Sequence, residues 1–335
     1  MLEIEKKVLD TISRYKLIQE KDKVIVAVSG GPDSMCLLNL LYNFKIKNIK
    51  NYELYVAHVN HCIRKEAIED EKYVKQYCQK REIPCYIKRV NVSKVAVNNK
   101  RGLEETGRKV RYDFFEELYT DLKANKIAIA HNNNDNAETV LMNIIRGTGI
   151  VGLNGIVPIR NNKYIRPLIE CDRTQIEEYC KINNIMPRID ITNKQNDYTR
   201  NKIRNICIPY IKEELNSNII NNLKRLSEIA REENYFINKI VEENYNKIKI
   251  EEKENTIIID LKKFNELDIF IRKKMVFYII GLLLGNPTGI SKIHIEDIIR
   301  MCKNNIGNKY LKPNKSVKIL LKNKKIFFLI DTNLP

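Results

Sequence analysis

The sequence predicts an α/β protein: a parallel sheet comes first, and a smaller, mainly helical domain that ends in a β-hairpin follows. Strand-like apolar runs alternate with helical patterns in the first part, and a turn with two glycines joins the first run to a helix. Such alternation is typical of right-handed crossover units, in which each helix connects two parallel strands. A change of pattern near residue 210, with a break at Pro209, predicts the second part.

The hydrophobic periodicity places the elements of both parts. The expected strands of the first part are 24–28, 53–59, 86–92 and 126–131. Its expected helices are 1–16, 34–44, 67–81, 104–122 and 136–146. The second part is expected to hold helices 216–246 and 267–284 and a hairpin of strands 317–321 and 326–330. We therefore divide the chain into residues 1–213 and 214–335.

The turn after the first strand reads Ser29-Gly30-Gly31-Pro32-Asp33-Ser34. Glycines let the backbone approach an anion closely, and a helix start offers free N–H groups and a positive dipole end. Asp33 beside a phosphate requires a bridging metal ion. The turn lacks the final Gly-Lys-Ser/Thr of a Walker A loop and the third glycine of a dinucleotide fingerprint. This turn alone does not distinguish a phosphate-binding loop from an ordinary tight turn between a strand and a helix.

Polar residues also follow the later strands, namely His58, Asn60, His131 and Asp135. Parallel sheets bind ligands beyond the carboxyl ends of their strands, so we expect these residues near the glycine turn. His58, His61 and Cys62 do not complete the ligand spacing of a metal site.

Asp135 and Glu138 fall in the first turn of an expected helix. Acidic residues there favour the helix dipole, so spacing alone favours helix capping. The functional alternative is a carboxylate pair that binds Mg²⁺ or a cationic amine.

The net charge of +17 and the pI near 9.3 indicate a polyanionic partner, although lysine-rich composition is an alternative explanation. Arginine binds phosphate bidentately, and it recurs near the ends of elements. These arginines are Arg108, Arg111, Arg146, Arg166, Arg173, Arg200 and Arg204. The last two lie in a basic stretch, 198–205, that suits either nucleic acid or a solvated helix.

The eight cysteines include no Cys-x-x-Cys pair, as expected for free thiols in a reducing cytosol. The longest apolar stretch, 275–284, is too short to span a bilayer. We therefore expect a cytoplasmic protein with no membrane partner.

Taken together, the motifs resemble the tRNA(Ile)-lysidine synthases, a family of N-type ATP pyrophosphatases in the PP-loop superfamily. The matching stretches are 29–34, 57–64, 104–108 with Arg111-Tyr112, 130–135 with Glu138-Thr139, Arg146-Gly147, Gly152-Leu153, 165–168, Asp190 with Asn193, and 200–204. They span about residues 20–210 in order. Gly107 stands where the family usually has alanine, and about 120 residues follow the catalytic domain, as in the shorter architecture of this family.

The resemblance implies a PP-loop catalytic domain over residues 1–213 and a tRNA-binding region over 214–335. ATP would adenylate the C2 oxygen of the wobble cytidine in a CAU-anticodon tRNA(Ile) and release pyrophosphate. The ε-amine of free L-lysine would then attack C2 and displace AMP. The product, lysidine, changes the codon and amino-acid identity of the tRNA from Met to Ile.

The resemblance also implies roles for individual residues. ATP would be bound by Ser29, Gly30, Gly31, Pro32, Asp33, Ser34, His58 and Asn60, with Asp33 holding Mg²⁺. The catalytic residues would be Asp33, Arg108, His131, Asp135 and Glu138. Lysine and tRNA would contact Asp135, Glu138, Arg111, Arg146, Arg200 and Arg204.

Three alternatives stay in view. A PP-loop tRNA-thiolating enzyme would usually carry a Cys-x-x-Cys pair or an iron–sulfur site, which this sequence lacks. Small-molecule amidating relatives give no reason for the basic charge. A non-catalytic tRNA- or nucleotide-binding protein gives no reason for Asp33, Asp135 and Glu138 together. The oligomeric state is open, a homodimer included.

Overall fold

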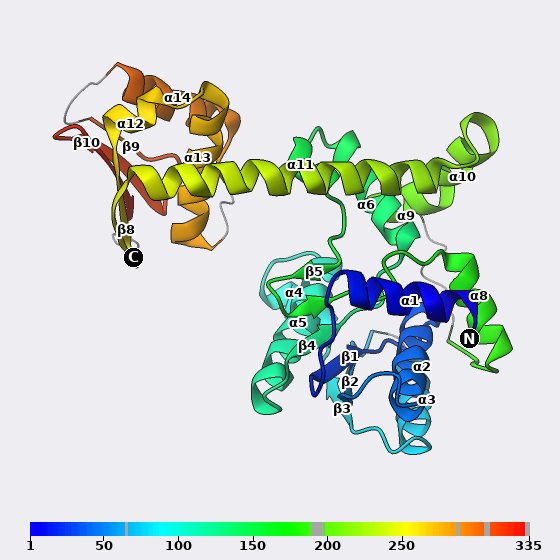
Figure 1. The fold of residues 1–335 in the computed structure, drawn as a ribbon. Coiled ribbons are helices and arrows are strands. Elements are labelled where there is room, and N and C mark those ends of the chain that lie inside the picture. The colour runs from blue at the N-terminus through cyan, green and yellow to red at the C-terminus, as the bar shows by residue number, and fades with distance from the viewer. Residues whose placement is uncertain (64–65, 189–195, 197, 286–288, 305–308, 332–335) are drawn as a thin grey trace. The chain divides into compact units, whose positions relative to one another are not determined.

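A computed structural model describes residues 1–63, 66–188, 196, 198–285, 289–304 and 309–331 (Figure 1). The chain divides into two compact units, Met1–Ala230 and Arg231–Pro335. The division falls inside helix α11 (Ile219–Ile248), whereas the boundary proposed from the sequence, after residue 213, precedes this helix.

The first unit contains a six-stranded sheet with the strand order β3-β2-β1-β4-β6-β5. The strands are β1 (Lys23–Ala27), β2 (Glu53–Asn60), β3 (Cys85–Arg89), β4 (Lys126–Ala128), β5 (Ile159–Arg160) and β6 (Tyr164–Ile165). All pairs are parallel except β5 with β6. The parallel α/β sheet expected from the sequence is confirmed, and the two-residue strands β5 and β6 extend it.

Helices cover both faces of this sheet. The helices described before residue 183 are α1 (Glu3–Arg14), α2 (Pro32–Ile46), α3 (Ala67–Gln79), α4 (Val92–Asn98), α5 (Leu103–Asp121), α6 (Asn133–Ile145), α7 (Ile150–Leu153) and α8 (Arg173–Ile182). Val24 and Val26 of β1 pack in the core formed with α1, α2, α3 and α8. Ile25 packs on the opposite face with Phe114 and Phe115 of α5. Alternate side chains of one buried strand thus serve two cores.

Two expected strands end earlier than the sequence indicated. The strand expected over 86–92 ends at Arg89, because Asn91 caps α4 by accepting a hydrogen bond from the Lys94 N–H (3.0 Å). The strand expected over 126–131 ends at Ala128, and the residues after it lead into α6.

The expected chain break at Pro209 is wrong. Pro209 lies inside a continuous helical segment over residues 199–215, made of α9 (Thr199–Lys202), α10 (Ile208–Tyr210) and two stretches of wider π-type turns. Proline lacks an N–H group and its ring clashes with the preceding turn of a regular α-helix, and the helix here changes to π-type turns on both sides of α10.

The second unit contains a five-stranded antiparallel sheet with the order β7-β8-β11-β10-β9. Its strands are β7 (Lys249–Lys253), β8 (Thr256–Asp260), β9 (Tyr310–Leu311), β10 (Val317–Lys322) and β11 (Lys325–Ile330). The predicted hairpin is confirmed as β10–β11. The expected helices over 216–246 and 267–284 are confirmed as α11 and α13 (Ile269–Leu284).

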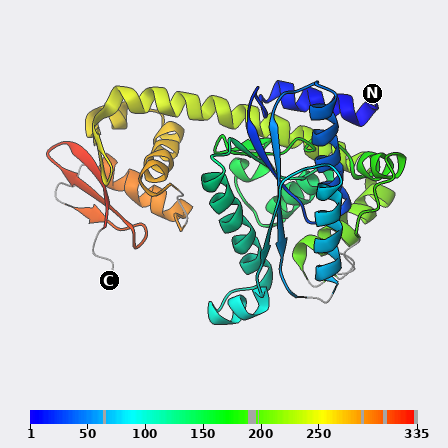
Figure 2. The ribbon, with the colours of Figure 1, turned by 90° about the horizontal axis from the view of Figure 1, so that it is seen from below.

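Helices α12 (Leu261–Glu266), α13 and α14 (Lys292–Lys303) pack with the end of α11 against one face of this sheet (Figure 2). Gly285 ends α13 in the left-handed conformation (φ +69°), and Pro287 lies outside the described residues. Within the described ranges, no helix combines the length and apolar character that a bilayer crossing requires.

Gly107 should accept alanine, the residue usual in the resembled family. It lies within α5, and an added Cβ would be 3.6 Å from His61 Cε1 and 3.7 Å from Val92 Cγ1, which are ordinary van der Waals distances. Alanine loses less conformational entropy than glycine in a helix. We expect Gly107→Ala to raise the free energy of unfolding by about 0.5–1 kcal/mol in urea titrations.

The matched control for this substitution is Gly30→Ala. Gly30 has φ +93°, which L-residues rarely adopt, so the same methyl group should lower the free energy of unfolding. Destabilisation by Gly107→Ala would contradict the packing described around α5.

Candidate functional site

The glycine turn lies at the carboxyl end of β1 and leads directly into α2. Ser34 Oγ donates a hydrogen bond to the Gly31 carbonyl (3.0 Å) and accepts one from the Ser29 N–H (3.1 Å). Pro32 is the first residue of α2, and Gly31 provides no side-chain cap. The first N–H groups of α2 therefore remain available to an anion.

Asn132 connects two of the predicted carboxylates. This fully buried side chain donates from Nδ2 to Asp33 Oδ1 (2.8 Å) and accepts from the Asp135 N–H at Oδ1 (3.0 Å). Burial and the nearby charge of Asp135 raise the pKa of Asp33. Asn132 was not among the predicted site residues, although asparagine three residues before an acidic residue is a capping signal.

The two predicted acidic residues of α6 behave differently. Asp135 Oδ2 accepts the Asn132 N–H (3.2 Å), which completes a capping box, so the capping role favoured by the spacing is present. Glu138 is buried and takes no part in this cap. Helix capping therefore explains the acidic residue at position 135 but not the one at position 138.

Both carboxylates form ion pairs with arginines from the 199–215 segment. Glu138 Oε2 accepts from Arg200 Nε (2.9 Å) and from Arg204 Nη2 (2.8 Å). Asp135 Oδ1 accepts from Arg204 Nη2 (2.9 Å), with Arg200 Nη2 at 3.4 Å. We call these four residues the Asp–Glu–Arg–Arg cluster. The sequence suggested a cationic amine as ligand for the two carboxylates and phosphate or nucleic acid for the two arginines, and the structure shows that these side chains bind one another.

His58 and Asn60 lie at the end of β2, as expected. The Val28 carbonyl can only accept, so His58 Nδ1, 2.8 Å away, donates to it and Nε2 is left as an acceptor. This Nε2 atom is buried and has no partner among the described residues. Burial lowers the pKa of His58, so the ring is neutral. Asn60 hydrogen-bonds the Glu71 carboxylate (2.9 Å) and other protein groups that shape the strand end.

His131 is held by a buried arginine. Arg166 Nε donates to His131 Nδ1 (3.1 Å), and Arg166 Nη1 donates to the Val157 carbonyl (2.6 Å). The proton of a neutral His131 is therefore on Nε2, which makes that atom a donor. Loss of hydration and the positive charges of Arg166 and Arg200 hold the pKa of His131 well below its usual range. The sequence placed Arg166 among the arginines but gave it no role at the site.

Of the remaining predicted arginines, Arg108, Arg111 and Arg146 are exposed and Arg173 is half-buried. The Arg108 guanidinium lies 5.0 Å from the centre of the Tyr112 ring, and the charges of Arg108 and Arg111 act on His131. Arg146 is exposed at the end of α6, and no described contact joins it to the other site residues. The motif residues Arg64, Asp190 and Asn193 lie outside the described residues.

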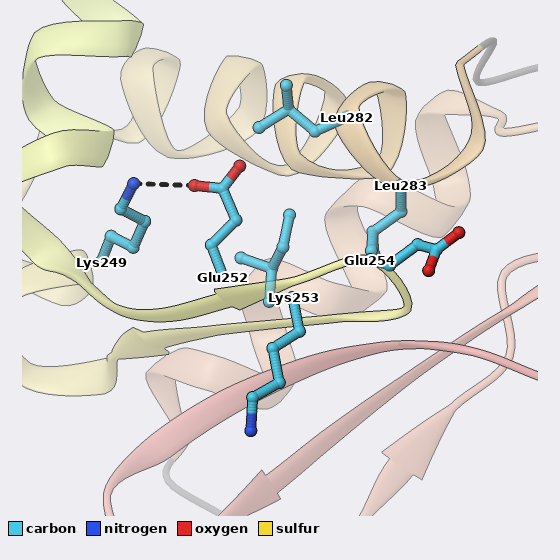
Figure 3. A pocket seen from close by; sticks show the side chains of 7 residues that line it. Lys249, Glu252, Lys253, Glu254, Leu282 and Leu283 are labelled. Atoms are coloured by element: carbon cyan, nitrogen blue, oxygen red, sulfur yellow. Dashed lines mark hydrogen bonds and ion pairs between the residues drawn. The ribbon is translucent and has the colours of Figure 1, made fainter.

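Two pockets lie outside this group of residues. One, of about 180 Å³, lies at the start of α8, and its lining includes Asn134, Arg173 and Lys212. The other, of about 490 Å³, lies in the second unit between β7, β8 and the end of α13 (Figure 3). Of its charged lining residues, Lys249 pairs with Glu252 (2.7 Å), whereas Lys253 pairs with Glu251, which does not line the pocket. It contains none of the residues predicted from the sequence.

The fold and this arrangement at the strand ends agree with a comparison against known families. A family model described as the PP-loop domain matches residues 2–211. The chain belongs to the PP-loop family. The glycine turn, Asp33 and the α6 carboxylates all lie inside the matched PP-loop region.

Similar proteins confirm the resemblance to lysidine synthases. The chain is 47% identical over 311 residues to a tRNA(Ile)-lysidine synthase of Clostridium acetobutylicum. The matched region covers 92% of this chain and 66% of that protein. It is 44% identical over 306 residues to a tRNA(Ile)-lysidine synthase of Clostridioides difficile, with 91% and 66% covered. The chain thus spans slightly less than two thirds of the length of these relatives.

Among solved structures, the U34-tRNA thiolase NcsA of Methanococcus maripaludis, with its [4Fe-4S] cluster, has a similar fold. The TM-score is 0.55 at 22% sequence identity, over 68% of this chain and 79% of that chain. At this identity the likeness shows the fold alone.

Stability of this PP-loop unit should depend on pH through its histidines. Burial and the charges of Arg111 and His58 lower the pKa of His61 to about 4 from 6.5. Between these values the unfolded chain binds a proton that the folded chain does not, so stability is lost as the pH falls. We expect urea midpoints to decrease from about pH 6.5 to about pH 4. His61→Asn should flatten this dependence, and an unchanged slope would contradict the assignment.

Proposed function

We propose that the chain ligates free L-lysine to C2 of the wobble cytidine of a CAU-anticodon tRNA(Ile) in the cytoplasm, with ATP as the activating substrate. One observation carries this proposal. Asn132 hydrogen-bonds Asp33 at the start of α2 and the N–H of Asp135, so an anion site and a carboxylate pair lie side by side. The similarity to named lysidine synthases supports this substrate choice over other PP-loop chemistry.

The glycine turn is the proposed site for the ATP phosphates. Transfer at the α-phosphate requires the departing pyrophosphate to be held by preorganised donors. Gly30, Gly31 and the free N–H groups of α2 supply such donors, with the Ser29 and Ser34 hydroxyls beside them. The acceptor Nε2 of His58 completes the proposed nucleotide contacts. Asn60, whose amide N–H groups donate to Ala67 and Glu71, would shape the end of β2 beside the nucleotide.

Asp33 fits a Mg²⁺ ion bound together with ATP. Magnesium in such sites is commonly held by one or two carboxylates plus substrate phosphates, and the ion neutralises charge on the transferring group. The carboxyl of Asp33 is close enough to Asp135 for that negative charge to raise its pKa, and a cation would relieve this repulsion.

Adenylation solves the leaving-group problem of the cytidine carbonyl. The C2 oxygen is a poor leaving group until it is esterified to AMP, after which the amine can displace it. His131 is proposed to donate a hydrogen bond from Nε2 to the reacting phosphate as a neutral ring, since its tautomer is fixed by Arg166. Arg108 and Arg111 would add positive charge at the same place.

The Asp–Glu–Arg–Arg cluster is proposed to receive the lysine ammonium. Only the neutral amine is nucleophilic, so a carboxylate near the ε-amine can accept the proton that the ammonium loses. In the structure both carboxylates are already paired with Arg200 and Arg204. Lysine must therefore displace a guanidinium or share a carboxylate with it.

The reaction itself is tested by incorporation of labelled lysine. We expect incorporation into a CAU-anticodon tRNA(Ile) transcript and none into tRNA(Met). ATP–pyrophosphate exchange should require the tRNA(Ile), since the adenylated group belongs to the RNA. Exchange that needs no tRNA, or no exchange at all, would overturn the proposal. Sulfur transfer to tRNA in place of lysine transfer would favour a thiolating enzyme.

The amine site is tested by Asp135→Asn. Loss of a charged hydrogen bond costs about 1.5–3 kcal/mol, so the KM for lysine should rise roughly 10- to 100-fold. Asp113→Asn is the control, because Asp113 is exposed on α5 and pairs with Lys109. Full lysidine formation by Asp135→Asn at limiting lysine would exclude Asp135 from the amine site.

A further inference from the structure

One face of the second unit's sheet points away from the helices. Alternate residues of β10 and β11, such as Ile319 and Phe328, are buried against α13 and α14. The residues between them point to the opposite side, which no described helix of this unit covers. We call this side the outer face. On β8, β9, β10 and β11 it is formed by Thr256, Ile258, Asp260, Tyr310, Lys318, Leu320, Lys322, Lys325, Phe327 and Leu329.

Apolar side chains form a row across the middle of the outer face. The strand register pairs Tyr310 with Leu320, Leu320 with Phe327, and Phe327 with Ile258. Tyr310 is 56% exposed, and Phe327 is half-buried. Adjacent strands lie about 4.8 Å apart, so the two aromatic rings are two strand spacings from each other.

Lysines flank this apolar row on both sides. Lys318 Nζ lies 4.4 Å from the centre of the Tyr310 ring. Lys322 and Lys325 are exposed and directly opposite each other in the register. Like charges at such a position destabilise a sheet, and an anion bound between them would offset that cost. Asp260 follows Lys325 in the same row, but its carboxylate caps α12 by accepting the Lys263 N–H (2.8 Å).

The surrounding sequence strengthens the positive charge. Residues 303–330 contain eight lysines and no acidic residue. Lys312 pairs with Asp331, so its charge is already compensated. The positive charge of the outer face is therefore carried by lysines without a described carboxylate partner.

We propose that the outer face binds unpaired nucleotides of RNA, with bases stacking on Tyr310 and Phe327 and phosphates contacting Lys318, Lys322 and Lys325. Aromatic rings offer every base a stacking surface, and lysines neutralise the backbone. A protein partner fits less well, because lysine is depleted from the buried centres of protein interfaces. The inference rests on the proposed function in taking tRNA as the RNA.

The test measures binding of a labelled CAU-anticodon tRNA transcript at several salt concentrations, without ATP or lysine. Binding is thereby separated from catalysis: a chain that binds as expected but never incorporates lysine would refute the proposed function and leave this inference standing. Melting temperatures and circular dichroism verify that each variant is folded.

The triple variant Lys318→Gln, Lys322→Gln, Lys325→Gln should bind about tenfold or more weakly, and the slope of log K against log salt should become shallower by roughly 2–3. Tyr310→Leu should bind about fivefold or more weakly with an unchanged salt slope, because stacking carries no charge. The control is Lys262→Gln on α12, where an exposed lysine lies away from the outer face. It should bind like the unmodified chain.

Unchanged affinity of the triple variant and of Tyr310→Leu would overturn the inference, as would the absence of tRNA binding. Duplex RNA that competes as well as tRNA would show general charge attraction in place of stacking. A dimer in sedimentation experiments that Tyr310→Leu dissociates would show that a second copy covers this face.

Discussion

Strand β1 pairs in parallel with β2 on one side and with β4 on the other, and this pairing determines where the polar side chains of the site lie. Parallel strands end at a common edge, so the turns that follow all three strands open at the same place. The short bond between Asn132 and Asp33 joins two of these turns. A strand out of register would separate the glycine turn from the α6 carboxylates.

The sequence predicts the strands themselves and the ends of β1 and β2, because buried strands are apolar runs followed by glycine or polar residues. It places the ends of β3 and β4 too late, because the apolar residues after Arg89 and Ala128 already belong to the connections to the next helices. The sequence also predicts that His58, His131 and Asp135 lie at the carboxyl-terminal edge of the parallel sheet. It does not predict the pairing of Glu138 with Arg200 and Arg204, since this depends on how the 199–215 segment packs on α6. Arg166 is similar: a single arginine in a sequence gives no sign that it is buried against a histidine.

The second unit shows the same contrast. Its hairpin is visible in the sequence because two short, mainly apolar runs lie on either side of a short polar turn. Strands β7 and β9 cannot be recognised in the sequence, since β7 is mostly charged and exposed and β9 has two residues. Both are strands because neighbouring strands satisfy their backbone groups, which local sequence does not reveal. Base-stacking residues such as Tyr310 are therefore recognised only after the strand register is known.

The Asp–Glu–Arg–Arg cluster has two negative and two positive side chains, so its formal charges cancel. Buried ion pairs tolerate the loss of one partner poorly, because the remaining charge has no compensation. A cation that enters the cluster must share a carboxylate with a guanidinium or displace it, and a displaced guanidinium requires another anion. Under the proposed function, binding of the lysine ammonium and binding of a phosphate by Arg200 or Arg204 would therefore be coupled.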